Sequence, residues 1–149
     1  MRKPISTLLE EVRPYARKLV LAAAAQGIII KIISGLRTYA EQDALFNQGR
    51  TTKGNIVTKA RGGYSNHNFG IAFDIGVFVK EKYITAAANY DSVGPLGSAL
   101  GLEWGGNWDF KDRPHYQLRP QWAAKLSEAK MIEELRRRKA AKLPIFTPT

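Results

Sequence analysis

The sequence contains no cysteine and only two histidines among its 149 residues. Without cysteine the chain has no disulfide, no zinc site built on thiolates and no cysteine nucleophile. Its most apolar run, residues 19–30, includes Gln26 and Gly27 and is shorter than the roughly 20 residues that a membrane-spanning helix needs. Glu10 and Glu11 interrupt any apolar region near the start, which disfavours a signal peptide. We therefore expect that the protein does not insert stably into a membrane. We also expect that it is synthesised in the cytoplasm without a signal peptide.

Acidic residues are few relative to basic ones. The sequence has 23 lysines and arginines but 13 aspartates and glutamates, which gives a net charge of +10. Residues 119–149 alone hold eight basic and three acidic residues. Such a charge favours an anionic partner: nucleic acid, an anionic membrane or a cell-wall polymer. The chain shows no nucleic-acid-binding motif, and its basic residues are not interleaved with aromatic ones, so we expect no nucleic acid as partner.

The length and the 44% hydrophobic content fit one globular domain over residues 1–149. We expect a core of about residues 5–118, followed by a basic C-terminal helix and tail over residues 119–149. Within the core, residues 50–63 combine basic residues with glycines and have little periodicity, which is typical of a loop.

Hydrophobic periodicity and turn residues predict an α+β fold, with a small, mostly antiparallel sheet flanked by helices. Pro14 either separates the first two predicted helices or lies in the first turn of the second. The predicted helices span residues 6–12, 13–26, 39–48 and 86–100, the last with a break near Gly94 and Pro95, and a final helix begins near Pro120. This final helix carries an apolar stripe of Trp122, Leu126, Ala129, Ile132 and Leu135, and the tail 144–149 after it is expected to be loose. The predicted strands span residues 28–34, 70–79, 83–85 (after a turn at 80–82), 102–104 and 115–118.

The predicted strand 70–79 has two unlike faces, because successive side chains of a strand point to opposite sides. Gly70, Ala72 and Asp74 share a small, polar face that suits a metal cleft. The other face is bulky and apolar and suits the core; it consists of Ile71, Phe73, Ile75 and Val77.

A catalytic zinc site uses three protein ligands and leaves one position open. With no sulfur available, such a site here needs His67, His115 and one carboxylate, and Asp74 is the natural third ligand. Asp112, three residues before His115, could act as a general base toward the attacking water. Arg37 follows the first predicted strand and could stabilise an oxyanion or hold a substrate carboxylate.

Three motifs together resemble the zinc DD-peptidase and L-alanyl-D-glutamate peptidase family, which includes carboxypeptidases, dipeptidases and phage endolysins. The first is Ser65-x-His67-x-x-Gly70-x-Ala72-x-Asp74 and the second is Asp112-x-x-His115. The third is the arginine motif Ser34-Gly35-Leu36-Arg37-Thr38-Tyr39-Ala40-Glu41-Gln42. The run Gly101-Leu102-Glu103-Trp104-Gly105-Gly106-Asn107-Trp108 is similar to the endolysin branch in particular. The resemblance spans roughly residues 27–118.

The resemblance implies roles for individual residues. His67, Asp74 and His115 match the zinc ligands of the family, so the expected cofactor is Zn²⁺. Asp112 matches the catalytic carboxylate, which is a glutamate in the dipeptidase branch. Arg37 matches an arginine that polarises the scissile carbonyl or binds substrate. Ser65 matches a serine that we expect to contact substrate or support its loop.

The function implied by the resemblance is a zinc-dependent peptidoglycan endopeptidase that cleaves the L-Ala–D-Glu bond of the stem peptide. Its expected setting is a phage or prophage endolysin, a monomer that acts on the anionic cell wall after holin-dependent release and lyses the host. One alternative is a D-Ala-D-Ala carboxypeptidase or dipeptidase of the same family. A non-catalytic, basic wall-binding module is a second alternative.

Structural interpretations stand beside these functional ones. Asp109 and Glu103 lie close enough in sequence to compete with Asp112 for the role of base, and Arg37 could simply form an ion pair. The final helix fits a solvated face, since Glu133 and Glu134 each precede an arginine by four residues. The three tryptophans favour the core over a substrate platform; they are Trp104, Trp108 and Trp122.

Overall fold

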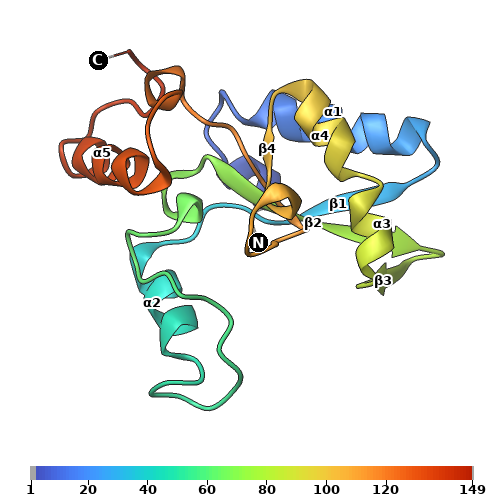
Figure 1. The fold of residues 1–149 in the computed structure, drawn as a ribbon, viewed down its shortest axis with the longest axis horizontal. Helices are drawn as coiled ribbons and strands as arrows, with labels where there is room; N and C mark the ends of the chain where they lie inside the picture. The colour runs from blue at the N-terminus through green and yellow to red at the C-terminus, as the bar shows by residue number, and fades with distance from the viewer. Residues whose placement is uncertain (1–2, 149) are drawn as a thin grey trace.

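The computed structural model describes residues 3–148 and has an α+β fold built on one five-stranded sheet, as predicted (Figure 1). The strand order is β1-β2-β5-β4, with β3 paired to β2, and every pairing is antiparallel. The strands are β1 (Ile29–Ser34), β2 (Ala72–Val79), β3 (Lys82–Ile84), β4 (Glu103–Trp104) and β5 (His115–Gln117).

Helices gather at two ends of this sheet. Figure 1 shows α1, α3 and α4 together at one end, and α2 and α5 at the other. The α-helices are α1 (Arg13–Ala25), α2 (Tyr39–Asn47), α3 (Ala87–Asp91), α4 (Gly94–Leu100) and α5 (Glu128–Ala140), and the short 3₁₀ helices are η1 (Pro4–Thr7), η2 (Asn66–Phe69), η3 (Gly105–Asn107) and η4 (Gln121–Ala123). No helix of the described residues is both long and apolar enough to span a membrane.

The core lies on the predicted apolar face of β2. Phe73, Ile75 and Val77 are buried there and belong to one cluster with α1, α4 and β5. The Phe73 ring stacks on the Tyr116 ring with centroids 5.7 Å apart. Because this face is fixed by packing, the opposite face of β2 presents Asp74 away from the core.

The N-terminal segment differs from the prediction. Residues 8–12 form turns rather than a helix, and the first α-helix begins at Arg13, with Pro14 in its first turn. The backbone N–H of Leu9 donates instead to the carbonyl of Gly70 at 3.1 Å, which ties this segment to the start of β2. Proline in a first helical turn loses no intrahelical hydrogen bond, so the second interpretation of Pro14 is confirmed.

The hairpin between β2 and β3 is tighter than predicted. Lys80 and Glu81 have φ of 51° and 68°, and Lys82 already pairs with Val79. Two central residues with positive φ match the twist of the flanking strands, so Lys82 joins β3 rather than the turn.

The C-terminal segment corrects two predictions. Ser127 caps α5 by accepting from the N–H of Lys130 at 3.2 Å, so residues 121–126 form a separate short turn. The buried residues of α5 are Met131, Leu135 and Arg138. Of the predicted stripe, Leu135 is buried and Trp122 and Ile132 are partly buried, whereas Leu126 and Ala129 are exposed.

The tail over residues 144–148 is anchored rather than loose, and Thr149 lies outside the described residues. Arg138 is buried and its Nη1 donates to the carbonyls of Pro144 and Thr147. Trp122 Nε1 donates to the carbonyl of Ile145 at 2.8 Å. The side chains of α5 pack against η2 in a second apolar cluster, so the C-terminal segment lies directly beside the site described next.

Candidate active site

His67 is positioned by the short helix η2. Ser65 precedes η2, and its Oγ accepts from the N–H of His67 at 3.2 Å. Gly70 ends η2 with φ of 75°, a conformation that glycine adopts without steric cost, and the chain then enters β2. The functional stretch is therefore a capped turn joined to a central strand, which fixes His67 relative to Asp74.

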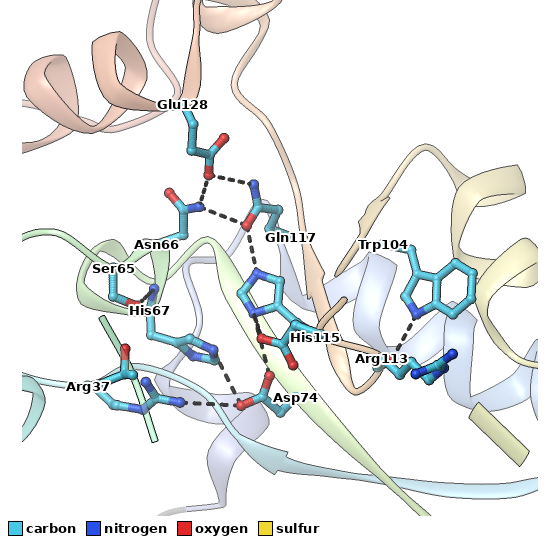
Figure 2. Close-up of polar contacts among 12 residues, drawn as sticks. Arg37, Ser65, Asn66, His67, Asp74, Trp104, Arg113, His115, Gln117 and Glu128 are labelled. Carbon is cyan, nitrogen blue, oxygen red and sulfur yellow. Dashed lines mark hydrogen bonds and ion pairs between the residues drawn. The ribbon is translucent and has the colours of Figure 1, made fainter. Parts of the chain in front are cut away.

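Asp74 and His115 face each other directly in the register of β2 and β5. Asp74 Oδ1 lies 3.5 Å from His115 Nδ1, and Asp74 Oδ2 lies 3.4 Å from His67 Nε2. The two imidazole rings are 5.0 Å apart and nearly perpendicular. One potential ligand atom from each of the three residues lies within 4.8 Å of the others (Figure 2).

The outer nitrogens of the two histidines both contact oxygen acceptors. His67 Nδ1 lies 2.9 Å from the carbonyl oxygen of Gly35, and His115 Nε2 lies 2.7 Å from Gln117 Oε1. Because these oxygens only accept, each outer nitrogen carries a proton and donates it. In the neutral ring the inner nitrogens then carry lone pairs, and these point at a carboxylate.

Two lone pairs and a carboxylate facing one another in a largely buried site form a set of donors that can hold a cation between them. His67 and His115 are 3% and 5% exposed, and the Asp74 side chain is 18% exposed. Two imidazoles and one carboxylate form a donor set that zinc uses in catalytic sites, and outer acceptors that fix the tautomer are typical of its histidine ligands. These residues therefore fit zinc, which is the cofactor.

The charges around Asp74 favour its ionised form. Burial alone would raise the pKa of Asp74, but when both rings are protonated the hydrogen bonds from His115 and His67 and the charges of the rings hold it well below its usual range. Arg37 Nη2 contacts Asp74 Oδ2 at 3.3 Å, and Arg37 Nη1 donates to the buried Gln42 at 3.0 Å. Arg37 is thus both paired with Asp74 and held at the edge of the site.

Asp112 lies beside the three residues without belonging to their cluster. Its Oδ2 is 3.8 Å from His115 Nδ1 and its side chain is half exposed. Burial raises the pKa of Asp112, and the nearby Asp74 charge acts in the same direction, against the pull of the His115 charge. Asp109 is exposed, and Glu103 is bonded to Gln117 and Arg119, so neither competitor takes this position.

A cleft of about 400 Å³ opens over these residues. Arg37, Ser65 and Asp112 line it together with the three cluster residues. Val57 and Tyr64 contribute from the segment 50–64, and Glu128 and Ile132 from α5. The site is therefore accessible from solvent.

Sequence reasoning missed several residues of the site. The Trp108 ring lies 5.0 Å from the His115 ring and lines the cleft, whereas Trp104 is core and Trp122 packs in the second cluster. Gln117 accepts from the outer nitrogen of His115, and Glu128 in turn accepts from Gln117 Nε2. Only the closeness of Gln117 to His115 could have indicated its role, and no local pattern marks Glu128.

The fold and the site together define a metallopeptidase. A family model described as D-alanyl-D-alanine carboxypeptidase matches residues 58–118. The peptidoglycan L-alanyl-D-glutamate endopeptidase CwlK of Bacillus subtilis is 44% identical over 120 residues, which cover 73% of this chain and 72% of that protein. An L-alanyl-D-glutamate peptidase of a Listeria phage is 30% identical over 119 residues, 76% of this chain but only 39% of that protein.

Solved structures share the fold. The L-Ala D-Glu endopeptidase ChiX of Serratia marcescens superposes with a TM-score of 0.61 at 20% identity, over 77% of this chain and 83% of that one. The D,D-pentapeptidase VanY in complex with Zn(II) superposes with a TM-score of 0.58 at 18% identity, over 93% of this chain and 81% of that one. The chain belongs to the zinc DD-peptidase and L-alanyl-D-glutamate peptidase family.

Proposed function

We propose that this protein is a zinc-dependent peptidoglycan endopeptidase that hydrolyses the L-Ala–D-Glu bond of the stem peptide. The observation that carries the proposal is the convergence of His67, Asp74 and His115 in an open cleft, with Asp112 directly beside them. The 44% identity to an endopeptidase of that specificity supports the choice of bond. The aspartate at position 112, in place of the glutamate of the dipeptidase branch, supports it as well.

The side chains divide the chemistry among them. His67 Nε2, Asp74 and His115 Nδ1 would hold zinc, which when bound would supply a Lewis acid for the attacking water and the scissile carbonyl. Asp112 takes the proton of the attacking water and returns it to the leaving amine, which its raised pKa favours. Arg37 stabilises negative charge that develops on the carbonyl oxygen. Ser65 contacts the substrate from the rim of the cleft.

The biological setting that fits best is a phage or prophage endolysin. The phage relative and the charge of +10, which favours the anionic wall, both support it. In this setting the protein is made in the cytoplasm without a signal peptide, reaches the wall after holin-dependent release and acts as a monomer. Expression inside a host should then cause lysis only when a holin is expressed as well, and lysis without a holin would contradict this setting.

Digestion of purified peptidoglycan tests the bond specificity. We expect fragments with a new N-terminal D-glutamate, identified by mass spectrometry, and no free D-alanine. Release of D-Ala or D-Ala-D-Ala would instead identify a carboxypeptidase or dipeptidase. Unchanged wall lysis in the presence of a strong chelator would contradict the zinc mechanism, and absence of any cleavage would favour a wall-binding module.

A further inference from the structure

The side-chain amide of Gln117 lies between the metal cluster and two carboxylates. Gln117 is fully buried on β5, two residues after His115. Its Oε1 accepts from His115 Nε2 at 2.7 Å and from Asn66 Nδ2 at 2.8 Å. Its Nε2 donates to Glu103 Oε1 at 3.1 Å and to Glu128 Oε1 at 3.3 Å. Figure 2 shows the chain of contacts from Asp74 through His115 and Gln117 to Glu128.

The orientation of this amide follows from its partners. Carboxylates accept hydrogen bonds and cannot donate them, so Glu103 and Glu128 hold the NH₂ group of Gln117 on their side. A flipped amide would turn its oxygen toward the two carboxylates and its NH₂ toward the NH₂ of Asn66. The contacts with Glu103, Glu128 and Asn66 would then be repulsive, in a buried place where an unmade hydrogen bond is costly. The carboxylates therefore fix which atom of Gln117 faces His115.

The amide in turn determines where the proton of His115 lies. An oxygen facing Nε2 requires the proton on Nε2 and leaves the lone pair on Nδ1, which is the nitrogen that faces Asp74. A flipped amide would donate to Nε2 and move the proton to Nδ1, where it would exclude a metal ion. The metal-binding form of His115 thus depends on groups that never contact the metal.

We propose that Glu103 and Glu128 are positioning residues that jointly hold His115 in its metal-binding tautomer through Gln117. Arg119 bridges the pair, with Nε 3.0 Å from Glu103 Oε1 and Nη2 2.8 Å from Glu128 Oε2. Arg119 and Glu128 lie beyond residues 58–118, the part that the family model matches. The basic C-terminal segment therefore completes the outer support of the metal site. The inference rests on the proposed zinc site.

Two carboxylates acting on one amide group should be partly redundant. Either one alone suffices to favour the observed orientation, so single substitutions should have small effects. Removing both releases the NH₂ group of Gln117 and also that of Asn66, which donates to Glu128 Oε1 as well, so the two amides can turn over together. The double variant should then lose about 10–100-fold in zinc affinity, the usual cost of losing an outer-shell partner. The two effects should consequently be strongly non-additive.

The test measures zinc affinity by chelator competition for the wild type, Glu103→Ala, Glu128→Ala and the double variant. The matched control is Glu133→Ala, which removes an exposed carboxylate from the same helix whose only ion pair among the described residues is with Lys130. We expect changes within about threefold for the single variants and the control, and a loss of about 10–100-fold for the double variant. Equal affinity of the double variant and the wild type would overturn the proposal, as would additive losses.

A second measurement needs no variant and so does not depend on variants that fold. In zinc-loaded, tag-free protein, ¹⁵N NMR of the imidazoles should show the proton of His115 on Nε2 and the metal on Nδ1; the chain has only two histidines, which makes assignment simple. A proton on Nδ1 would overturn the inference. Failure of the wild type to bind zinc would instead contradict the proposed function, so the two failures are distinguishable.

Discussion

The two histidines of the metal cluster are held by different kinds of acceptor. His67 Nδ1 donates to a main-chain carbonyl, that of Gly35, whereas His115 Nε2 donates to the side-chain amide of Gln117. A main-chain carbonyl presents only an acceptor, but an amide presents a donor when it turns over. The His67 end of the cluster therefore depends on the path of the backbone after β1. The His115 end depends on a network that reaches from Asn66 to Glu128.

This difference shows why one end of the site is visible in local sequence motifs and the other is not. Gly35 stands in the arginine motif and His67, which it supports, stands in the first histidine motif, so both partners at this end belong to recognisable motifs. The partners of Gln117 come from β4, from η2 and from the start of α5, and only folding brings them together. Substitutions that disturb the His67 side of the metal cluster should therefore differ in their effect on zinc affinity from those that disturb the His115 side.

The largest effect should come from Asp74→Asn, because Asp74 contacts both histidines and its replacement would remove the shared anion from both ends at once. Zinc affinity should fall by more than the roughly 10–100-fold that an outer-shell change costs, and lysis should be lost. Bound zinc by elemental analysis and wall turbidity measure the two outcomes. Full zinc occupancy with normal lysis would remove Asp74 from the site.

The next largest effect should come from Asp112, which supports neither His67 nor His115 in the metal cluster. Asp112→Asn should reduce the rate of cleavage by about 10²–10⁴-fold, the usual contribution of a general base, while zinc affinity changes little. The matched control is Asp109→Asn, an exposed aspartate three positions earlier, which should keep its activity. An Asp112→Asn variant that cleaves at the wild-type rate would exclude Asp112 as the base.

A smaller effect should follow from Gly35→Ala, which disturbs the His67 end alone. A Cβ at Gly35 would lie 2.4 Å from Thr7 Oγ1 and 2.5 Å from the Pro4 carbonyl oxygen, so the backbone that carries the His67 acceptor must shift. We expect a loss of about 1–3 kcal/mol in the free energy of unfolding and a several-fold loss of zinc affinity. Denaturant unfolding and chelator competition measure them.

Gly27→Ala is the control for that substitution. Gly27 has φ of 77°, and a Cβ at this position would have no other atom within 4 Å, so alanine there costs about 1–2 kcal/mol of backbone strain and no contact. It should destabilise the protein comparably without changing zinc affinity. If both alanine variants lose zinc equally, general destabilisation explains the loss and the Gly35 carbonyl has no special role.

The smallest effect should come from Glu134→Gln on α5, away from both ends. The hydrogen bonds of Arg137 and then Arg138 lower the pKa of Glu134 to about 2. A carboxyl whose pKa is lowered on folding stabilises the protein above its unfolded pKa, near 4.5, and this stabilisation is lost as the pH falls toward 2. The pair with Arg137 is largely exposed, and the glutamine oxygen of the variant can still accept from the buried Arg138, so we expect a loss of about 1 kcal/mol at pH 7.

Urea unfolding at several pH values between 7 and about 3 checks this prediction. The difference between the variant and the wild type should be constant above about pH 5 and shrink below it, with zinc affinity at pH 7 unchanged. A difference that grows as the pH falls would have the wrong sign for this carboxylate.

The sequence predicted the parts of the fold that depend on local pattern. The β-branched run before Ser34 and the alternation from Ile71 to Val77 indicated β1 and the core face of β2. The spacing from His67 to Asp74 also predicted that these residues lie together. Segments whose structure depends on distant contacts were predicted wrongly: residues 8–12 are tied to Gly70, and the tail is held by the buried Arg138.

The apolar stripe after Pro120 illustrates the same limit. Its periodicity fitted one continuous helix, but Ser127 starts a new helix, in which Met131 is buried beside Leu135 while Leu126 and Ala129 are exposed. The supporting role of Glu128 follows from that start, since it places the first residue of α5 against Gln117 and Asn66. No periodicity in the sequence could indicate a contact across 62 residues.

The central claim is that His67, Asp74 and His115 bind one zinc ion between them. A crystal structure of the zinc-loaded protein, with anomalous diffraction recorded at the zinc edge, tests it most directly. We predict one strong peak within about 2.0–2.2 Å of His67 Nε2, His115 Nδ1 and a carboxylate oxygen of Asp74. A fully active, zinc-loaded protein whose anomalous peak lies away from these three side chains would contradict the claim.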